Sequence, residues 1–240
     1  MTRSRWTGYR LSIDRLGTPL KHTEIQQAAV RLFAQKGYAA TGIRELGRAA
    51  GINSATLYHY AGGKEEILSG IMRSCLDELL RSAIDAVGAS ADPGIQLARL
   101  VRAHVGLSAL NPLTARVTDQ EMRALTSEDR EALVGMRDDY ESIFAKVIER
   151  GARTGAFQLT DLRLARLALL EMCNGVANWY RPDGRLDVAD VQDRFVEFAC
   201  RLVGVPPVSR EESGDLPVPT RLASEPAADH MLTAGMEAAG

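Results

Sequence analysis

Residues 41–66 of the 240-residue chain read TGIRELGRAAGINSATLYHYAGGKEE, and they are the most informative part of the sequence. It holds two short helical patterns separated by a tight turn over 49–53. In that turn Ala49 is small enough to let the two helices approach, Gly51 permits a left-handed backbone, and Ile52 fills the space between the helices. Two such helices after a supporting helix make a helix-turn-helix, which places its second helix in the major groove of DNA.

The residue types around this turn indicate how it would hold DNA. Thr41 is a good N-cap for the first short helix, and Asn53 or Ser54 caps the second. The exposed start of the second helix carries only short side chains, so we expect little direct reading of base edges. Arg44 is the long side chain expected to reach a guanine edge or a phosphate, and it is the leading candidate for specificity. Lys64, with the amides at the start of the next helix, can hold a phosphate.

The aromatic residues of this stretch offer donors to the DNA backbone. Tyr58, His59 and Tyr60 carry hydroxyl and imidazole groups that suit sugar and phosphate oxygens. Simpler interpretations stay open: Tyr58 could be a core aromatic and Lys64 an ordinary solvated cation. His59 could be a pH sensor or a ligand instead of a surface or DNA-facing residue.

The charge of the chain is split in a way that its net charge of −2 conceals. Residues 1–64 hold ten Lys and Arg against three Asp and Glu, a balance of +7; the other 176 residues hold 19 against 28, a balance of −9. Such asymmetry indicates that the basic part binds a polyanion. The first 20 residues form either an arm that enters a minor groove or a disordered basic tail that adds affinity without selectivity. Their arginines are Arg3, Arg5, Arg10 and Arg15.

Residues 41–66 contain the pattern Thr41-x-x-Arg-Glu-Leu-x-x-Ala-Ala-Gly-Ile-x-x-Ala-x-Leu-Tyr-x-Tyr60, followed by Lys64-Glu-Glu66. This pattern resembles the N-terminal domain of the TetR (tetracycline-repressor) family of transcriptional regulators. The resemblance spans about residues 23–70. It implies contacts to the DNA backbone from the Thr41, Tyr58 and Lys64 positions. The predicted DNA contacts are therefore Thr41, Arg44, Asn53, Ser54, Ala55, Thr56, Tyr58, His59, Tyr60 and Lys64.

Helical periodicity continues from Lys21 to Gly204 without strand signals, so we predict an all-α fold with an N-terminal three-helix DNA-binding domain and a C-terminal helical domain for ligand binding and dimerisation. Five of the nine prolines lie in 206–240, which has no aromatic residue, and this composition predicts disorder. The predicted parts are a disordered basic arm (1–20), the DNA-binding domain (21–66), the ligand-binding and dimerisation domain (67–205) and a disordered tail (206–240). Capping side chains predict further helix starts at Asp92-Pro93, Asn111-Pro112, Thr126–Asp129, Thr160-Asp161 and Asp187.

A single short recognition helix reads too few base pairs to select one genomic site, so we expect a two-fold dimer on a pseudo-palindrome. The family resemblance implies that the last two long helices, about 161–181 and 188–203, form that dimer as a four-helix bundle. The alternative is that their apolar rows complete the core of one chain. The predicted interface residues are Leu167, Leu170, Val176, Trp179, Val191, Phe195 and Phe198.

A polar stripe on a mostly apolar helix suggests a ligand site in the body. Glu171, Asn174 and Asn178 share one helical face, and buried polar groups of this kind need partners. An inducer is one partner; interhelical hydrogen bonds or solvent at the dimer edge are others.

A narrower resemblance concerns the ligand. It rests on three segments: Asp119-Gln-Glu-x-Arg123-x-Leu125, Arg137-x-x-Tyr140 and Asn178–Leu186. These segments resemble C-terminal regions of TetR regulators that control fatty-acid or sterol-ring degradation. The resemblance implies a bulky apolar acyl ligand with an anionic coenzyme A part, for which Arg123 and Arg137 are suitable partners. The candidate ligand residues are His104, Asp119, Met122, Arg123, Arg137, Glu171, Asn174 and Asn178.

Other classes of protein find little support. The sequence has no Gly-rich phosphate loop, G-x-S-x-G, H-E-x-x-H or Cys/His zinc spacing, so we expect no catalytic residues, no metal and no cofactor. Three separated cysteines and the lack of an apolar run of about 18 residues favour the cytoplasm and no membrane contact. We predict a homodimeric repressor of double-stranded DNA that a small apolar inducer releases; the alternative is a regulator controlled by a protein partner.

Overall fold

The structure is a computed structural model that describes residues 20–216 and 219–227. Every regular element in these two ranges is a helix, so the predicted all-α fold is confirmed. The arginines of the predicted N-terminal arm lie outside the described residues. The α-helices are α1 (Leu20–Lys36), α2 (Ile43–Ala49), α3 (Ser54–Ala61), α4 (Lys64–Gly88), α5 (Pro93–Leu110), α6 (Pro112–Gln120), α7 (Ser127–Arg153), α8 (Leu162–Trp179), α9 (Val188–Leu202) and α10 (Arg210–Ser213), with a 3₁₀ turn, η1 (Met122–Ala124).

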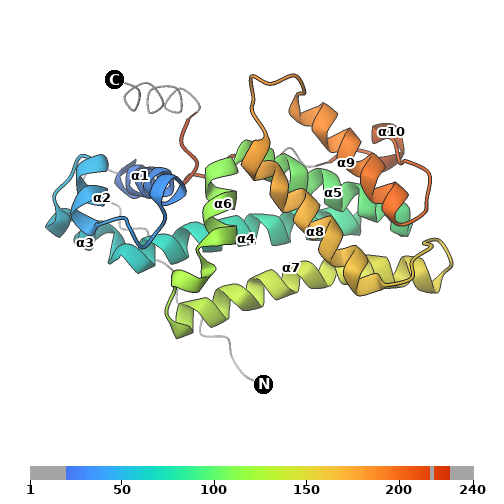
Figure 1. Cartoon of the computed structure of the whole chain (residues 1–240), viewed down its shortest axis with the longest axis horizontal. Coiled ribbons are helices and arrows are strands. Elements are labelled where there is room, and N and C mark those ends of the chain that lie inside the picture. Colours follow the sequence, from blue (N-terminus) through green and yellow to red (C-terminus); the bar gives the residue numbers. More distant parts are fainter. Residues whose placement is uncertain (1–19, 217–218, 228–240) are drawn as a thin grey trace.

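Helices α1 to α3 form a head at one end of the molecule, and α4 runs from the head into the body (Figure 1). Their apolar faces meet in one core that contains Phe33, Leu46, Leu57 and Leu68. The same core includes Val117 of α6, so apolar packing continues from the head into the body. The helix-turn-helix is therefore held by the body and not attached to it by a loose linker.

The turn between α2 and α3 has the predicted backbone but a different point of close approach. Gly51 adopts a φ of +67°, as its left-handed position requires. Gly47 is buried, and a Cβ added to it would lie 2.9 Å from the carbonyl oxygen of Ile52. Ala49 is exposed, so the prediction that it allows the helices to approach is wrong. The approach occurs at Gly47, which faces the turn while Ala49 faces outward.

Local capping was predicted correctly at four helix starts, but the cap predicted at Asn111 is wrong, because its side chain makes no capping hydrogen bond to α6. The cap predicted at Thr41 is wrong too: its hydroxyl donates to the carbonyl of Gly37 at 2.8 Å, and Gly42 becomes the N-cap of α2 with no side-chain cap. Thr126 likewise precedes α7 without a side-chain cap. The confirmed caps are Asn53, Asp92, Asp161 and Asp187, whose side chains accept the backbone N–H of Thr56, Ile95, Leu164 and Asp190 respectively.

Helices α8 and α9 each carry apolar residues on two faces. Four of the predicted interface residues, Leu170, Val176, Val191 and Phe195, are buried in the core of one chain, where they pack with α5 and α7. For these four the prediction of an interface is wrong, because their row of α8 and α9 faces α5 inside the same chain. The three other predicted residues are exposed: Leu167 by 41%, Trp179 by 49% and Phe198 by 48%.

The segment after α9 is ordered where the structure describes it, which corrects the predicted disorder of 206–216 and 219–227. Buried arginines of α5 supply the reason. Arg102 donates to the carbonyl of Val208 and pairs with Asp193, each at 3.0 Å, and Arg99 donates to the carbonyl of Asp215 at 3.0 Å. These donors need acceptors because burying an unpaired guanidinium is costly. The C-terminal segment supplies part of those acceptors with its backbone.

Candidate nucleic-acid interface and ligand cavity

The outward face of α3 carries the predicted DNA contacts. Asn53 fixes the first turn by accepting the N–H of Thr56 at 2.8 Å, so its side-chain oxygen is committed to the cap. Tyr58 is 56% exposed, which excludes its interpretation as a core aromatic. Ala55 and His59 are also exposed, and Ser54 and Thr56 are half-buried beside them. Tyr60 is half-buried and packs against the core of the head, so most of its ring is used for folding.

Two arginines of α2 stand beside α3. Arg44 and Arg48 are four residues apart and therefore share one face of the helix. Both side chains are exposed, and neither makes a hydrogen bond or an ion pair with another described residue. Glu45 lies between them in sequence and pairs instead with Lys36 of α1. Arg48 was not among the predicted contacts, although its spacing from Arg44 was a usable signal.

Lys64 holds the head together, and this changes its predicted role. Its ammonium group donates to the carbonyls of Tyr38 at 2.7 Å and Thr41 at 2.8 Å, and it lies 3.9 Å from the centre of the Tyr38 ring. Burial lowers the pKa of Lys64. The side chain of Thr41 is buried, so the implied contact of that side chain with DNA is wrong. The simpler interpretation of Lys64 as a solvated cation is also wrong, because two of its three N–H donors bind the turn between α1 and α2.

The same turn is joined to the body. The backbone N–H of Tyr38 donates to the carboxylate of Glu121 at 2.9 Å, across 83 residues of sequence. Glu121 directly follows α6, and α6 packs against α1, α4 and α8. Tyr38 is thus held through its N–H by Glu121 and through its carbonyl by Lys64. We call this arrangement of Tyr38, Lys64 and Glu121 the head–body junction.

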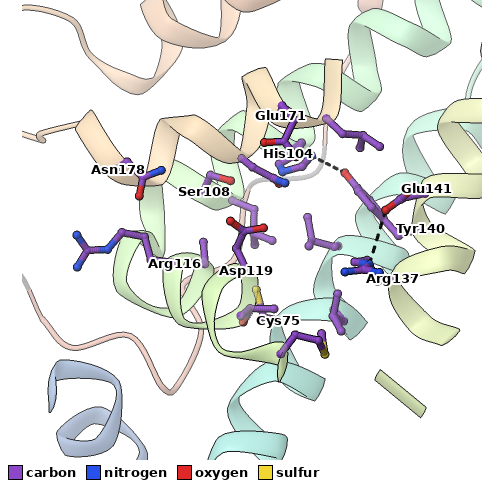
Figure 2. Close-up of a pocket in the computed structure, with 18 of the residues that line it drawn as sticks. Cys75, His104, Ser108, Arg116, Asp119, Arg137, Tyr140, Glu141, Glu171 and Asn178 are labelled. Carbon is purple, nitrogen blue, oxygen red and sulfur yellow. Dashed lines mark hydrogen bonds and ion pairs between the residues drawn. The ribbon is translucent and has the colours of Figure 1, made fainter. Parts of the chain in front are cut away.

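A cavity of about 140 Å³ lies in the body between α4, α5, α6, α7 and α8 (Figure 2). Seven of the eight candidate ligand residues line it; Arg123 is the exception, because it lies exposed on η1 outside the cavity. Further polar lining residues were not predicted from the sequence: Cys75, Ser108, Arg116, Thr118 and Glu141. The lining candidates are His104, Asp119, Met122, Arg137, Glu171, Asn174 and Asn178.

A hydrogen-bonded chain forms one wall of the cavity. The hydroxyl of Tyr140 lies 2.8 Å from Nδ1 of His104, and His104 is also hydrogen-bonded to Asn174. Burial lowers the pKa of His104 to about 4, so the ring is neutral at pH 7. A neutral imidazole has one donor and one acceptor nitrogen, which suits one bond to each neighbour. Burial also raises the pKa of Tyr140 well above its ordinary value.

Charged side chains line the rest of the cavity, and some of them form ion pairs while others do not. Arg137 pairs with Glu141 at 3.7 Å (Figure 2). Burial raises the pKa of Asp119, although the charge of Arg137 opposes this. Arg116 has no ion pair with any described residue, and its buried Nε lacks a hydrogen-bond partner. Arg116 therefore has an unpaired guanidinium at the edge of the cavity, and Figure 2 shows it directed away from Asp119.

The described residues form no metal site, no disulfide and no membrane-spanning helix. No group of three or more His, Cys, Asp and Glu side chains in the two described ranges could hold a metal ion. The three cysteines are free and buried, and burial raises the pKa values of Cys75 and Cys173 to about 12. No described helix is long and apolar enough to cross a membrane.

Comparison with known proteins gives the same assignment for both parts of the chain. Residues 25–71 match the family of bacterial regulatory proteins called the tetR family, and residues 90–203 match the tetracyclin repressor-like C-terminal domain. Residues 204–240 lie outside both matches.

Three relatives show the extent of the likeness. The HTH-type transcriptional repressor KstR2 of Rhodococcus jostii (strain RHA1) is 29% identical over 187 residues, which cover 77% of this chain and 92% of the relative. The fatty acid metabolism regulator protein of Bacillus subtilis (strain 168) is 25% identical over 180 residues, covering 74% and 93%. The crystal structure of the TetR family transcriptional regulator PfmR from Thermus thermophilus is 31% identical with a TM-score of 0.67, covering 75% and 97%. The chain belongs to the TetR family, and it is a DNA-binding transcriptional regulator and not an enzyme.

Proposed function

We propose that the protein is a homodimeric repressor whose hold on a pseudo-palindromic operator is released by an acyl-coenzyme A or a related lipid metabolite. The observation that carries this proposal is the placement of α6. One side of this helix lines the cavity with Arg116, Thr118 and Asp119, and the residue after its end, Glu121, binds the head at Tyr38. A ligand that moves α6 therefore changes the position of the head.

The size and charge of the cavity support a ligand of this class. Pockets for drug-sized ligands occupy about 300 to 1,000 Å³, and this cavity is about 140 Å³, so a bulky acyl group displaces a wall as it enters. Arg116 offers an unpaired guanidinium for an anionic part of the ligand. The relatives named as a repressor and as a fatty acid metabolism regulator support repression and a lipid-derived signal.

The DNA side of the proposal assigns different roles to the two exposed faces of the head. Arg44 and Arg48 of α2, with Ala55, Tyr58 and His59 of α3, face outward. Arginine suits bidentate binding of a guanine edge, and tyrosine suits phosphate and sugar oxygens. Arg44 and Arg48 bind base edges or phosphates at the edge of the groove. Tyr58 and the short side chains of α3 fix the position of α3 along the DNA.

The test uses a duplex that the full-length protein selects from a random pool, with octanoyl-coenzyme A as the probe. We expect octanoyl-coenzyme A to raise the melting temperature and to weaken operator binding about tenfold or more in fluorescence anisotropy, because coupling between two sites is reciprocal. Coenzyme A alone and octanoate alone serve as controls for the two halves of the probe.

Two arginine variants make the test specific to the cavity. Arg116→Gln is expected to reduce the response to octanoyl-coenzyme A while operator affinity without the probe stays unchanged. Arg123→Gln removes an exposed arginine outside the cavity and should leave the response intact. An equal loss in both variants would contradict the role of Arg116. If acyl-coenzyme A thioesters neither stabilise the protein nor release DNA, control by a protein partner replaces this proposal.

A further inference from the structure

The N-terminus of α6 is capped from the far end of the chain. Asn111 precedes α6 but does not cap it, because its amide donates to the carbonyls of Leu107 at 3.0 Å and Thr220 at 2.9 Å. The carboxylate of Glu225 takes its place by accepting the N–H of Thr114 at 2.8 Å and that of Leu113 at 3.3 Å. A negative group at this position also interacts favourably with the helix dipole.

The segment 219–227, which we call the C-terminal strap, holds this cap in place. Its residue Leu222 donates its N–H to Asn111 Oδ1 at 2.7 Å, and the hydroxyl of Ser224 lies 3.1 Å from that of Thr114. Glu225 is 2% exposed, so water does not compete for its carboxylate. The strap is therefore fixed to the start of α6 by side-chain and backbone hydrogen bonds.

The strap also contacts the head. The amide of Gln27 in α1 donates to the carbonyl of Ala223 at 3.0 Å. Figure 1 shows the strap, in red, passing beside α1 and α6. At the other end of α6, Glu121 binds Tyr38 in the turn after α1. Both ends of α6 are thus tied to the head, and one of these ties is supplied by residues outside both family matches.

We infer that Glu225 is a positioning residue of this regulator: by capping α6 it holds the head–body junction in the arrangement that binds DNA. The inference rests on the proposed function, because it assigns to α6 the same role between cavity and head. A firmly capped α6 keeps Glu121 in register with Tyr38. An uncapped α6 frays at its start, and Glu121 at its other end no longer stays in place to bind Tyr38. The head then has to regain its position relative to the body each time it binds DNA.

The test compares full-length variants by hydrogen–deuterium exchange and by operator binding without any ligand. Glu225→Gln keeps the shape of the side chain and removes its charge. We expect faster exchange at Leu113 and Thr114, faster exchange at Tyr38, and operator binding weakened about fivefold. Glu121→Gln should speed exchange at Tyr38 and leave Leu113 and Thr114 unchanged.

The chain offers a matched control in its own C-terminal segment. Glu212 caps α10 by accepting the N–H of Ser209 at 2.7 Å, but it lies on the surface and contacts neither α6 nor the head. Glu212→Gln should leave exchange at Tyr38 and operator affinity as in the wild type. Where Glu225→Gln fails to fold, Glu225→Asp keeps the charge at a shorter reach and should show the same changes in weaker form.

The outcomes separate the inference from the proposed function. Faster exchange confined to the start of α6, with unchanged operator affinity, would show that Glu225 is only a local cap and would overturn the inference. Unchanged exchange at Leu113 and Thr114 would overturn it as well. If the wild type binds no selected duplex, the proposed function fails, and exchange at Tyr38 in Glu225→Gln still decides whether the strap positions the head.

Discussion

His104 shows how a single buried side chain links stability to pH. Its pKa falls from 6.5 to about 4 on folding because the ring is buried. Below pH 6.5 the unfolded chain binds a proton at this residue and the folded chain does not, so stability decreases as the pH falls from 6.5 towards 4. We expect this residue to lower the free energy of unfolding by about 2 kcal/mol between pH 7 and pH 5.

Urea denaturation of the wild type and of His104→Gln at both pH values checks this expectation. The variant removes the titrating ring, so its loss of stability between pH 7 and pH 5 should be smaller by about 2 kcal/mol. Parallel losses in the two proteins would show that the ring is protonated in the folded state. Tyr140→Phe removes the hydroxyl that lies 2.8 Å from Nδ1, and it reports on that hydrogen bond separately.

At the scale of elements, the contact between α2 and α3 depends on one missing side chain. In Gly47→Ala the new Cβ would lie 2.9 Å from the Ile52 carbonyl oxygen, and backbone must shift to relieve this contact. We expect the free energy of unfolding to fall by about 1 to 3 kcal/mol and operator binding to weaken, because α3 moves relative to α2. Gly135→Ala is the control: it lies in α7 with open space at its Cβ and should be neutral or stabilising. Equal stability of the two variants would contradict the close approach.

Some helix caps and cavity residues could be predicted from the sequence, and others could not. Helix starts with a local cap, such as Asp92 and Asp161, follow from neighbouring residues and were predicted correctly. The cap of α6 was not, because Glu225 lies 112 residues from Leu113. In the cavity, the polar stripe of α8 predicted Glu171, Asn174 and Asn178. Arg116 was not predicted as a ligand residue, because the sequence does not show that it lines the cavity without an ion-pair partner. That depends on how the helices pack.

At the scale of the whole molecule, the exposed apolar residues of α8 and α9 predict how two chains associate. Leu164 is 63% exposed and Phe198 48%, and such residues on adjoining helices mark an interface. We expect Phe198→Glu to shift the protein from a dimer towards a single chain of 26.1 kDa in light scattering, and to weaken operator binding with it. Ile84→Glu changes an apolar residue on α4 that is 59% exposed, and it should leave the mass of the dimer unchanged. Loss of the dimer in both variants would place the interface elsewhere.

Helix α4 connects the cavity to the head. Its 25 residues make a rod about 37 Å long, one end of which lies against the head while Cys75, Leu76 and Leu79 near its middle line the cavity. A tilt of about 5° about the cavity displaces the start of α4, roughly 20 Å away, by about 2 Å. In the proposed dimer, the two copies of α4 would move two recognition helices at once, and the major grooves that these helices would enter are about 34 Å apart. Under the proposed function, a ligand would therefore need to open the cavity only slightly to misalign both heads with their half-sites.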